Sequence, residues 1–160
     1  MKISDVLIPE LAMCDLDGCS KKKVLENISQ FIAQKLGADQ EQAFTLFRSM
    51  LARERLGSTG IGEGVAIPHC QVMGLEKVHG CLIKLNFSID FDAFDDQPVD
   101  LIFALIVPHE KNDEHLETLS KIAHIFHKES ARKQLRKCNN NRQLFDTAIM
   151  LDQTVQTCAL

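Results

Sequence analysis

The sequence predicts a single α/β domain, a sandwich in which a mixed β-sheet is flanked by helices on both faces. Its 160 residues are enough for one domain with a real core, and 45% hydrophobic and 25% charged residues are ordinary for a globular protein. Helical and strand-like patterns are mixed along the chain. The dense apolar run at residues 101–107 is typical of a strand buried on both faces, and such a strand needs covering helices on each side.

The first third of the chain predicts two amphipathic helices. Residues 2–11 are expected to form a short helical turn or edge element, followed by a turn whose Ser20 can cap a helix. Apolar residues then recur at helical spacing until Gly37 stops them, and Asp39 can cap a second helix. The spacing predicts that this second helix buries Ala43, Phe44, Leu46, Phe47, Met50 and Leu51.

Strand-like segments follow the second helix. Residues 65–67 and 78–87 are rich in Val, Ile, Leu and Phe and are predicted to be strands beside the central one. After the central strand, Asn112 or Asp113 can cap a helix that runs to about Lys128. Its buried stripe is expected to consist of Leu116, Leu119, Ile122, Ala123 and Phe126.

The C-terminal part predicts one or two short helices over residues 129–150. The last residues lack periodicity and are expected to form a loose tail at 153–160. The domain is therefore predicted to span residues 1–152.

The stretch at residues 53–70, RERLGSTGIGEGVAIPHC, holds four of the eight glycines and ends just after a Pro-His pair. Glycines let peptide N–H groups converge on a small region, as in an anion cradle. A P-loop would need a lysine, which is absent between Gly57 and His69, and a dinucleotide fingerprint would need its glycines between a strand and a helix. Two alternatives remain, a phosphate-accepting His69 beyond a rigid Pro68, or a glycine-rich surface turn beside an incidental histidine.

The run GSTGIGEGVAIPH, with FDAFDDQPVDLIFALIVP and HLETLSKIA downstream, closely resembles the IIA domains of the fructose and mannitol class of the bacterial phosphotransferase system. Within that class the chain most resembles the stand-alone nitrogen-regulatory IIA proteins. The resemblance covers nearly the whole sequence. It implies that His69 carries a phosphoryl group, that Arg53 and His115 complete the site, and that the fold is a mixed sheet flanked by helices.

The positions of the site residues agree with that chemistry. Arg53 lies at the edge of its helix's apolar stripe, and its planar fork of donors suits phosphoryl oxygens, although a surface arginine would fit the same periodicity. His115 falls on the buried face near a helix N-terminus, where anions are favoured; the alternative is a hydrogen-bonded core histidine. Ser58, Thr59 and Gly60 are expected to shape the loop and bind phosphate oxygens. An imidazole with the ordinary pKa of about 6.5 is mostly neutral at neutral pH and can accept the group.

The resemblance implies a phosphoryl acceptor and relay. An HPr-type phosphocarrier protein would donate the group, and the nitrogen type would act mainly as a regulator of target proteins through its phosphorylation state. The alternative is the IIA component of a fructose- or mannitol-type sugar transporter, which passes the phosphate to a separate IIB domain. A chain of this length has no room for a IIB or membrane domain, which favours the regulator. Phosphoryl transfer of this kind needs positioning above all, so no metal, nucleotide or other cofactor is expected.

Composition argues against several other classes. A net charge of −4 disfavours nucleic acid as the main partner, because phosphate backbones are bound by clustered Lys and Arg. The aspartates between residues 90 and 100 do not match an EF-hand loop, so a metal site is not expected there. The six scattered cysteines indicate reduced thiols, and no apolar stretch approaches the roughly 20 residues of a membrane span. A cytoplasmic protein is expected.

The residues after His69 depart from the family pattern. Relatives commonly have a glycine and then a basic residue there, whereas this chain has Cys70 and Gln71. Cys70 can be an inert small residue at a tolerant position, as free cysteines usually are. The alternative is a partly exposed thiol that Arg53 and nearby N–H groups shift toward the thiolate, which would make it alkylatable and oxidisable.

Overall fold

The structure, a computed structural model, describes residues 2–110 and 114–158, and within these ranges it describes all side chains except those at 114–115 and 154–158. The helices are α1 (Ile3–Val6), α2 (Lys21–Lys35), α3 (Gln40–Arg55), α4 (Glu114–His127), α5 (Glu129–Arg136) and α6 (Asn141–Cys158), with a 3-10 turn at Pro9–Leu11. The strands are β1 (Ala12–Leu16), β2 (Gly60–Gly62), β3 (Val65–Ala66), β4 (His69–Val72), β5 (His79–Ile89) and β6 (Val99–Pro108).

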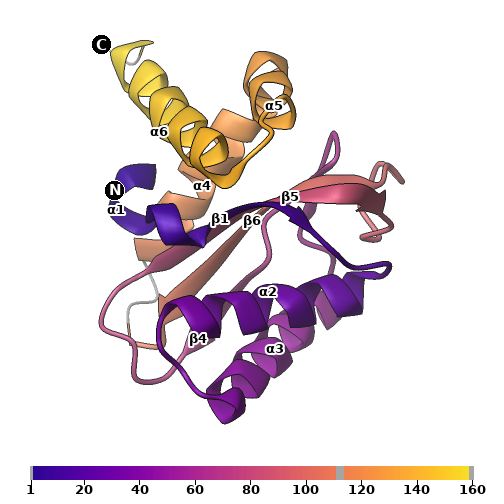
Figure 1. Cartoon of the computed structure of the whole chain (residues 1–160), viewed down its shortest axis with the longest axis vertical. Coiled ribbons are helices and arrows are strands. Elements are labelled where there is room, and N and C mark those ends of the chain that lie inside the picture. Colours follow the sequence, from indigo (N-terminus) through magenta and orange to yellow (C-terminus); the bar gives the residue numbers. More distant parts are fainter. Residues whose placement is uncertain (1, 111–113, 159–160) are drawn as a thin grey trace.

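The strands of the described residues form one mixed sheet. Their order is β1, β5, β6, β3, β2, and β4 pairs with β6 further along that strand. The β1–β5, β3–β6 and β4–β6 pairs are parallel, whereas β5–β6 and β2–β3 are antiparallel. Figure 1 shows α2 and α3 on one side of the sheet and α4, α5 and α6 on the other. The predicted fold class, a mixed sheet flanked by helices on both faces, is confirmed.

Strand β6 is the centre of the core. All of its residues except the half-buried Asp100 are buried, as the apolar run predicts. It pairs with β5 on one edge and with β3 and β4 on the other. The helices on each side of the sheet cover both of its faces, which is why the strand carries almost no polar residue.

The first two long helices begin where their caps predict. Ser20 Oγ accepts a hydrogen bond from the Lys23 backbone N–H at 3.2 Å, and α2 starts at Lys21, directly after Ser20. Asp39 forms a capping box with Gln42, in which each side chain accepts from the other residue's backbone N–H. Gly37 takes a φ of +73°, the left-handed conformation that commonly ends a helix. These local signals fix α2 and α3 independently of the sheet.

The structure contains a strand where the sequence predicts only a turn. β1 lies parallel to β5, and its register shifts between Cys14 and Leu16. Asp15, between them, has a φ of +67°, so the strand carries a bulge at a charged residue. Burial alternates along the strand, with Ala12, Cys14 and Leu16 buried, but the pattern covers only five residues and Asp15 is its one charged position. Pairing with a strand 70 residues away, which the register joins as Ala12 to Leu82, determines the conformation of this segment.

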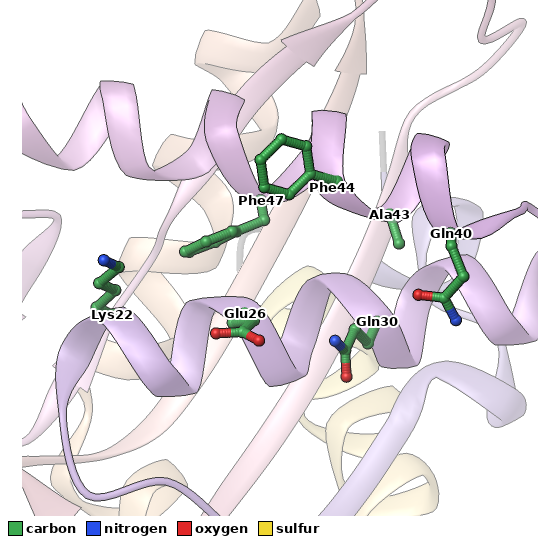
Figure 2. Close-up of a pocket in the computed structure, with 7 residues that line it drawn as sticks. All are labelled: Lys22, Glu26, Gln30, Gln40, Ala43, Phe44 and Phe47. Carbon is green, nitrogen blue, oxygen red and sulfur yellow. The ribbon is translucent and has the colours of Figure 1, made fainter.

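Two other expectations need correction. Phe44, assigned to the buried face of α3, is 58% exposed because it faces the outer groove between α2 and α3, which Figure 2 shows. The C-terminal residues predicted as a loose tail at 153–160 are helical as far as Cys158, the end of α6. The helix continues because its earlier turns pack on the domain: Leu151 and Asp152 are both buried.

Candidate functional site

His69 begins a new strand segment at a break in the sheet. β3 and β4 lie one after the other along β6, with Val65 opposite Leu101 and His69 opposite Leu105. Pro68 separates the two segments because proline has no N–H to donate to the ladder. Its carbonyl still accepts from the Leu105 N–H at 2.9 Å, so the break is short and the backbone before His69 is fixed.

The ring of His69 is hydrogen-bonded at both nitrogens. Nδ1 lies 3.0 Å from the carbonyl oxygen of Ile67, and a carbonyl can only accept, so Nδ1 carries the proton. Nε2 then has the lone pair, and it accepts a hydrogen bond from Arg53 Nε at 3.3 Å. The network assigns this tautomer and leaves the ring's lone pair on Nε2.

Arg53 is placed by the last turn of α3 and by the loop that follows it. Its Nη1 donates to the carbonyl of Gly57 at 2.8 Å while its Nε points to His69. The guanidinium is always protonated, so a positive charge lies directly beside Nε2 of His69. The predicted pairing of Arg53 with His69 in one site is therefore present in the structure.

Two cavities open on either side of this pair, and both are lined by Arg53 and His69. The first, the α3-side cavity, has a volume of about 580 Å³. Its other lining residues are Ser49, Ala52, Leu56, Cys70, Gln71 and Val107. The second, the α4-side cavity, has a volume of about 350 Å³. Its other lining residues are Ser58, Thr59, Gly60, Ile61, Ile67, Leu119, Ser120 and Ala123.

His115 is the second residue of α4, and its side chain lies outside the described residues. Its backbone is four residues before Leu119, which lines the α4-side cavity. Residues four apart on a helix lie on one face, so position 115 shares the face that lines the cavity. The role of His115 in the site stays a prediction. Leu116, assigned to the buried stripe of α4, is 62% exposed, which corrects that expectation at the end of the helix nearest the site.

Ser58, Thr59 and Gly60 line the α4-side cavity, but their polar groups bond within the protein. Ser58 Oγ donates to the carbonyl of Phe91 at 2.6 Å and accepts from the Gly60 N–H at 3.1 Å. The Thr59 N–H donates to Glu54 Oε2 at 3.0 Å, and the Thr59 hydroxyl donates to Glu54 Oε1. These bonds fix the shape of the loop. Direct phosphate binding by the three residues stays a prediction, and these groups would have to exchange a protein partner to do it.

Cys70 is buried, and burial raises the pKa of its thiol to about 12. A thiolate is the reactive form, so this cysteine is an inert thiol at neutral pH. The alternative of a partly exposed, reactive Cys70 is therefore wrong. Burial is the cause of the shift: Cys70 is only 7% exposed, although it forms part of the wall of the α3-side cavity.

Two charged residues beneath the site, Glu54 and Lys21, are not identified by the sequence pattern. Glu54 is buried, and Lys21 Nζ pairs with its Oε2 at 3.2 Å. A signal was present, because Glu54 follows Phe47 and Met50 at spacings of seven and four and so extends the apolar stripe of α3. A carboxylate on a buried stripe requires a partner, which the periodicity does not identify.

The chain belongs to the EIIA 2 family of the phosphoenolpyruvate-dependent sugar phosphotransferase system, whose family model matches residues 6–149. The resemblance seen in its motifs is confirmed, and the protein is a phosphotransferase system component. None of the described helices combines the length and apolarity that crossing a bilayer requires.

Known relatives indicate which branch of the family is most similar. The nitrogen regulatory protein of Pseudomonas aeruginosa is 38% identical over 149 residues, covering 93% of this chain and 96% of that protein. The nitrogen regulatory protein of Escherichia coli strain K12 is 37% identical over 146 residues, covering 91% of this chain and 88% of that protein. Among solved structures, nitrogen regulatory protein IIA-Ntr from Neisseria meningitidis matches with a TM-score of 0.83 and 34% identity, covering 91% of this chain and 98% of that one. The predicted similarity to the nitrogen-regulatory proteins is confirmed.

Proposed function

We propose that His69 accepts a phosphoryl group on Nε2 from a phosphorylated HPr-type carrier, and that the phosphorylation state of the protein regulates target proteins in the manner of the nitrogen type. The observation that carries the proposal is the pair of hydrogen bonds on the ring, from Nδ1 to the Ile67 carbonyl and from Arg53 Nε to Nε2. Together they present a neutral imidazole in one tautomer beside a fixed positive charge. The names of the relatives support the regulatory role.

The transfer follows from this geometry. The lone pair of His69 Nε2 attacks the phosphorus of the donor phosphohistidine, the new P–Nε2 bond forms, and the P–N bond to the carrier breaks. The Nδ1 proton stays on the ring, where the Ile67 carbonyl stabilises the positive charge that develops. Arg53 exchanges its bond to Nε2 for the equatorial phosphoryl oxygens, which its planar fork fits. His115 is proposed to bind the same oxygens, as the family resemblance implies.

The proposal includes the extent of the domain. The family match ends at residue 149, but Leu151 and Asp152 are buried and Asp152 Oδ2 accepts the Ile3 N–H at 2.9 Å. This contact joins α6 to the start of α1. We therefore assign residues 1–152 to the functional domain.

Intact-mass measurement after incubation with the phosphorylated carrier tests the acceptor. The wild type should gain one phosphoryl group, and His69→Ala should gain none while keeping its fold, because His69 lies outside the apolar core. His124→Ala is the matched control, since His124 is an exposed histidine of α4 that lines neither cavity, and it should be modified like the wild type. A His69→Ala protein that is still modified once would overturn the assignment.

A second measurement separates the regulator from the sugar-transport alternative. Phosphorylated protein is mixed with isolated IIB domains of the fructose and mannitol type, and loss of the group from His69 is followed by mass. A regulator is expected to keep its phosphoryl group or to return it only to the carrier. Rapid transfer to a IIB domain, at the rate of transfer from the carrier, would favour the transporter component instead.

A further inference from the structure

An ion pair between a buried carboxylate, Glu54, and the partly buried Lys21 lies beneath the loop that shapes the site. Glu54 directly follows Arg53 in α3 and is only 5% exposed. Both of its oxygens accept hydrogen bonds from Thr59, and Lys21 Nζ lies 3.2 Å from Oε2 and 5.0 Å from the centre of the Phe91 ring. A carboxylate buried this deeply requires such partners, and its burial is costly compared with an apolar residue of similar size. Replacing a buried ion pair by apolar residues of similar volume often leaves the stability of a protein unchanged or higher.

Two routes connect Thr59 to the ring of His69, one entirely through hydrogen bonds and one that begins with the backbone from Thr59 back to Gly57. In the first, the Thr59 carbonyl accepts from the Ile67 N–H at 3.0 Å, and the Ile67 carbonyl accepts from His69 Nδ1 at 3.0 Å. In the second, Gly57, two residues before Thr59, accepts from Arg53 Nη1, and Arg53 Nε donates to His69 Nε2. The position of the Thr59 backbone therefore affects both hydrogen bonds that orient the His69 ring, the one from Nδ1 to Ile67 and the one from Arg53 to Nε2.

We propose that Glu54 and Lys21 are positioning residues for phosphoryl acceptance, which act through Thr59 to fix the tautomer and orientation of His69. The inference rests on the proposed function of His69. Neither Glu54 nor Lys21 is among the described residues that line the two cavities, so their effect is on placement and not on contact with the phosphoryl group or the carrier. Small misplacements of a reacting group, near 1 Å, cost about a hundredfold in rate.

Three variants test the inference. Thr59→Val removes the hydroxyl and keeps the branched shape, Thr59→Ser keeps the hydroxyl, and Glu54→Gln removes the charge. Initial rates of phosphorylation are measured over a range of carrier concentrations to separate kcat from KM. We expect kcat to fall roughly ten- to a hundredfold in Thr59→Val and Glu54→Gln with KM unchanged, and Thr59→Ser to recover most of the rate.

Asp152→Asn provides the matched control for a purely structural effect. Asp152 is also a buried carboxylate, 6% exposed, that accepts a backbone N–H, but it joins α6 to the start of α1 and lines neither cavity beside His69. This variant should lose thermal stability and keep the wild-type kcat. If Glu54→Gln does not fold, Thr59→Val tests the same connection, because it leaves the buried charges in place.

A nitrogen-15 spectrum of His69 in the unphosphorylated protein gives a readout that needs no phosphoryl transfer. The wild type should show one tautomer with the proton on Nδ1, and Thr59→Val and Glu54→Gln should show a mixture. Wild-type kcat and an unchanged tautomer in both variants would overturn the inference, as would an equal loss of kcat in Asp152→Asn. A wild type that is not phosphorylated at all would refute the proposed function, while the tautomer comparison would still test the positioning.

Discussion

At the scale of the residue, Arg53 bonds with two different edges of its guanidinium group, to Gly57 and to His69. A lysine ammonium is a compact point charge and cannot make both bonds in this geometry. We predict that Arg53→Lys slows phosphorylation of His69 by roughly ten- to a hundredfold, since a lost hydrogen bond to a charged group costs about 1.5 to 3 kcal/mol. Rapid-quench kinetics measures the rate. Arg55→Lys, at an exposed arginine in the same helical turn, is the control, and equal rates for the two variants would contradict the assignment.

His115→Ala is predicted to slow the same step without preventing folding. The residue would supply a donor to the phosphoryl oxygens, not the acceptor nitrogen, so the reaction should remain detectable. The same rapid-quench assay measures it, with His127→Ala as the control because His127 is exposed at the far end of α4. A wild-type rate for His115→Ala would remove His115 from the site.

Burial of Cys70 makes the stability of the protein depend on alkaline pH. Its pKa is about 12 in the folded chain, whereas a free thiol has about 8.5, so the folded state retains the proton longer. The contribution of the Cys70 thiol to the free energy of unfolding is fully present below the pKa of the thiol in the unfolded chain. It falls by about 1.4 kcal/mol per pH unit as the pH rises from there toward the pKa in the folded chain. Cys70→Ala should lose less stability than the wild type between about pH 8.5 and about pH 10.5 in urea unfolding.

Labelling with iodoacetamide provides a separate check on Cys70. Cys19 is the exposed cysteine among those whose side chains are described, so it should be alkylated first, and Cys70 only after unfolding. Parallel pH slopes for Cys70→Ala and wild type, or early labelling of Cys70, would contradict its burial as a neutral thiol.

At the scale of the element, the sequence predicts what local interactions decide. The starts of α2 and α3 follow from Ser20 and Asp39, whose caps involve residues three positions away. β1 could not be predicted, because it is only five residues long and its partner is distant in the chain. In the site, the IPH motif identifies His69, and the resemblance of the chain to the IIA family identifies Arg53. The Ile67 carbonyl that sets the tautomer of His69 is a backbone group, and no side-chain pattern reveals it.

The β2–β3 hairpin depends on one crowded glycine. Gly64 has a φ of +79°, and a Cβ there would collide with the Arg136 guanidinium and lie 3.1 Å from Asp100 Oδ1, the ion pair that joins α5 to β6. We predict that Gly64→Ala destabilises the protein by about 1 to 3 kcal/mol, and by more than Gly74→Ala. Gly74 has a similar φ of +86° but nothing within 4 Å of a Cβ, so it controls for backbone strain alone. Equal urea midpoints for the two variants would show that the contact with Arg136 is unimportant.

At the scale of the whole molecule, apolar side chains that a core would normally contain surround the entrance to His69. Leu56 is 85% exposed and lines the α3-side cavity, and Ile61 is 37% exposed and lines the α4-side cavity. Exposed apolar residues gathered around a reactive group are typical of a surface that a protein partner covers. Phe44 is also exposed, but it lies in the outer groove between α2 and α3, opposite Lys22, Glu26 and Gln30 (Figure 2).

We predict that Leu56→Ser weakens docking of the phosphocarrier and leaves the chemical step intact. Leu56 makes none of the hydrogen bonds that orient His69, so kcat should be unchanged, whereas KM should rise roughly tenfold if docking buries the side chain, which is worth about 1.5 to 3 kcal/mol. Phe44→Ser removes an exposed aromatic residue that lines neither cavity beside His69 and should change neither parameter. Steady-state phosphorylation over a range of carrier concentrations measures both. An unchanged KM in Leu56→Ser, or an equal rise in Phe44→Ser, would place the carrier on a different surface.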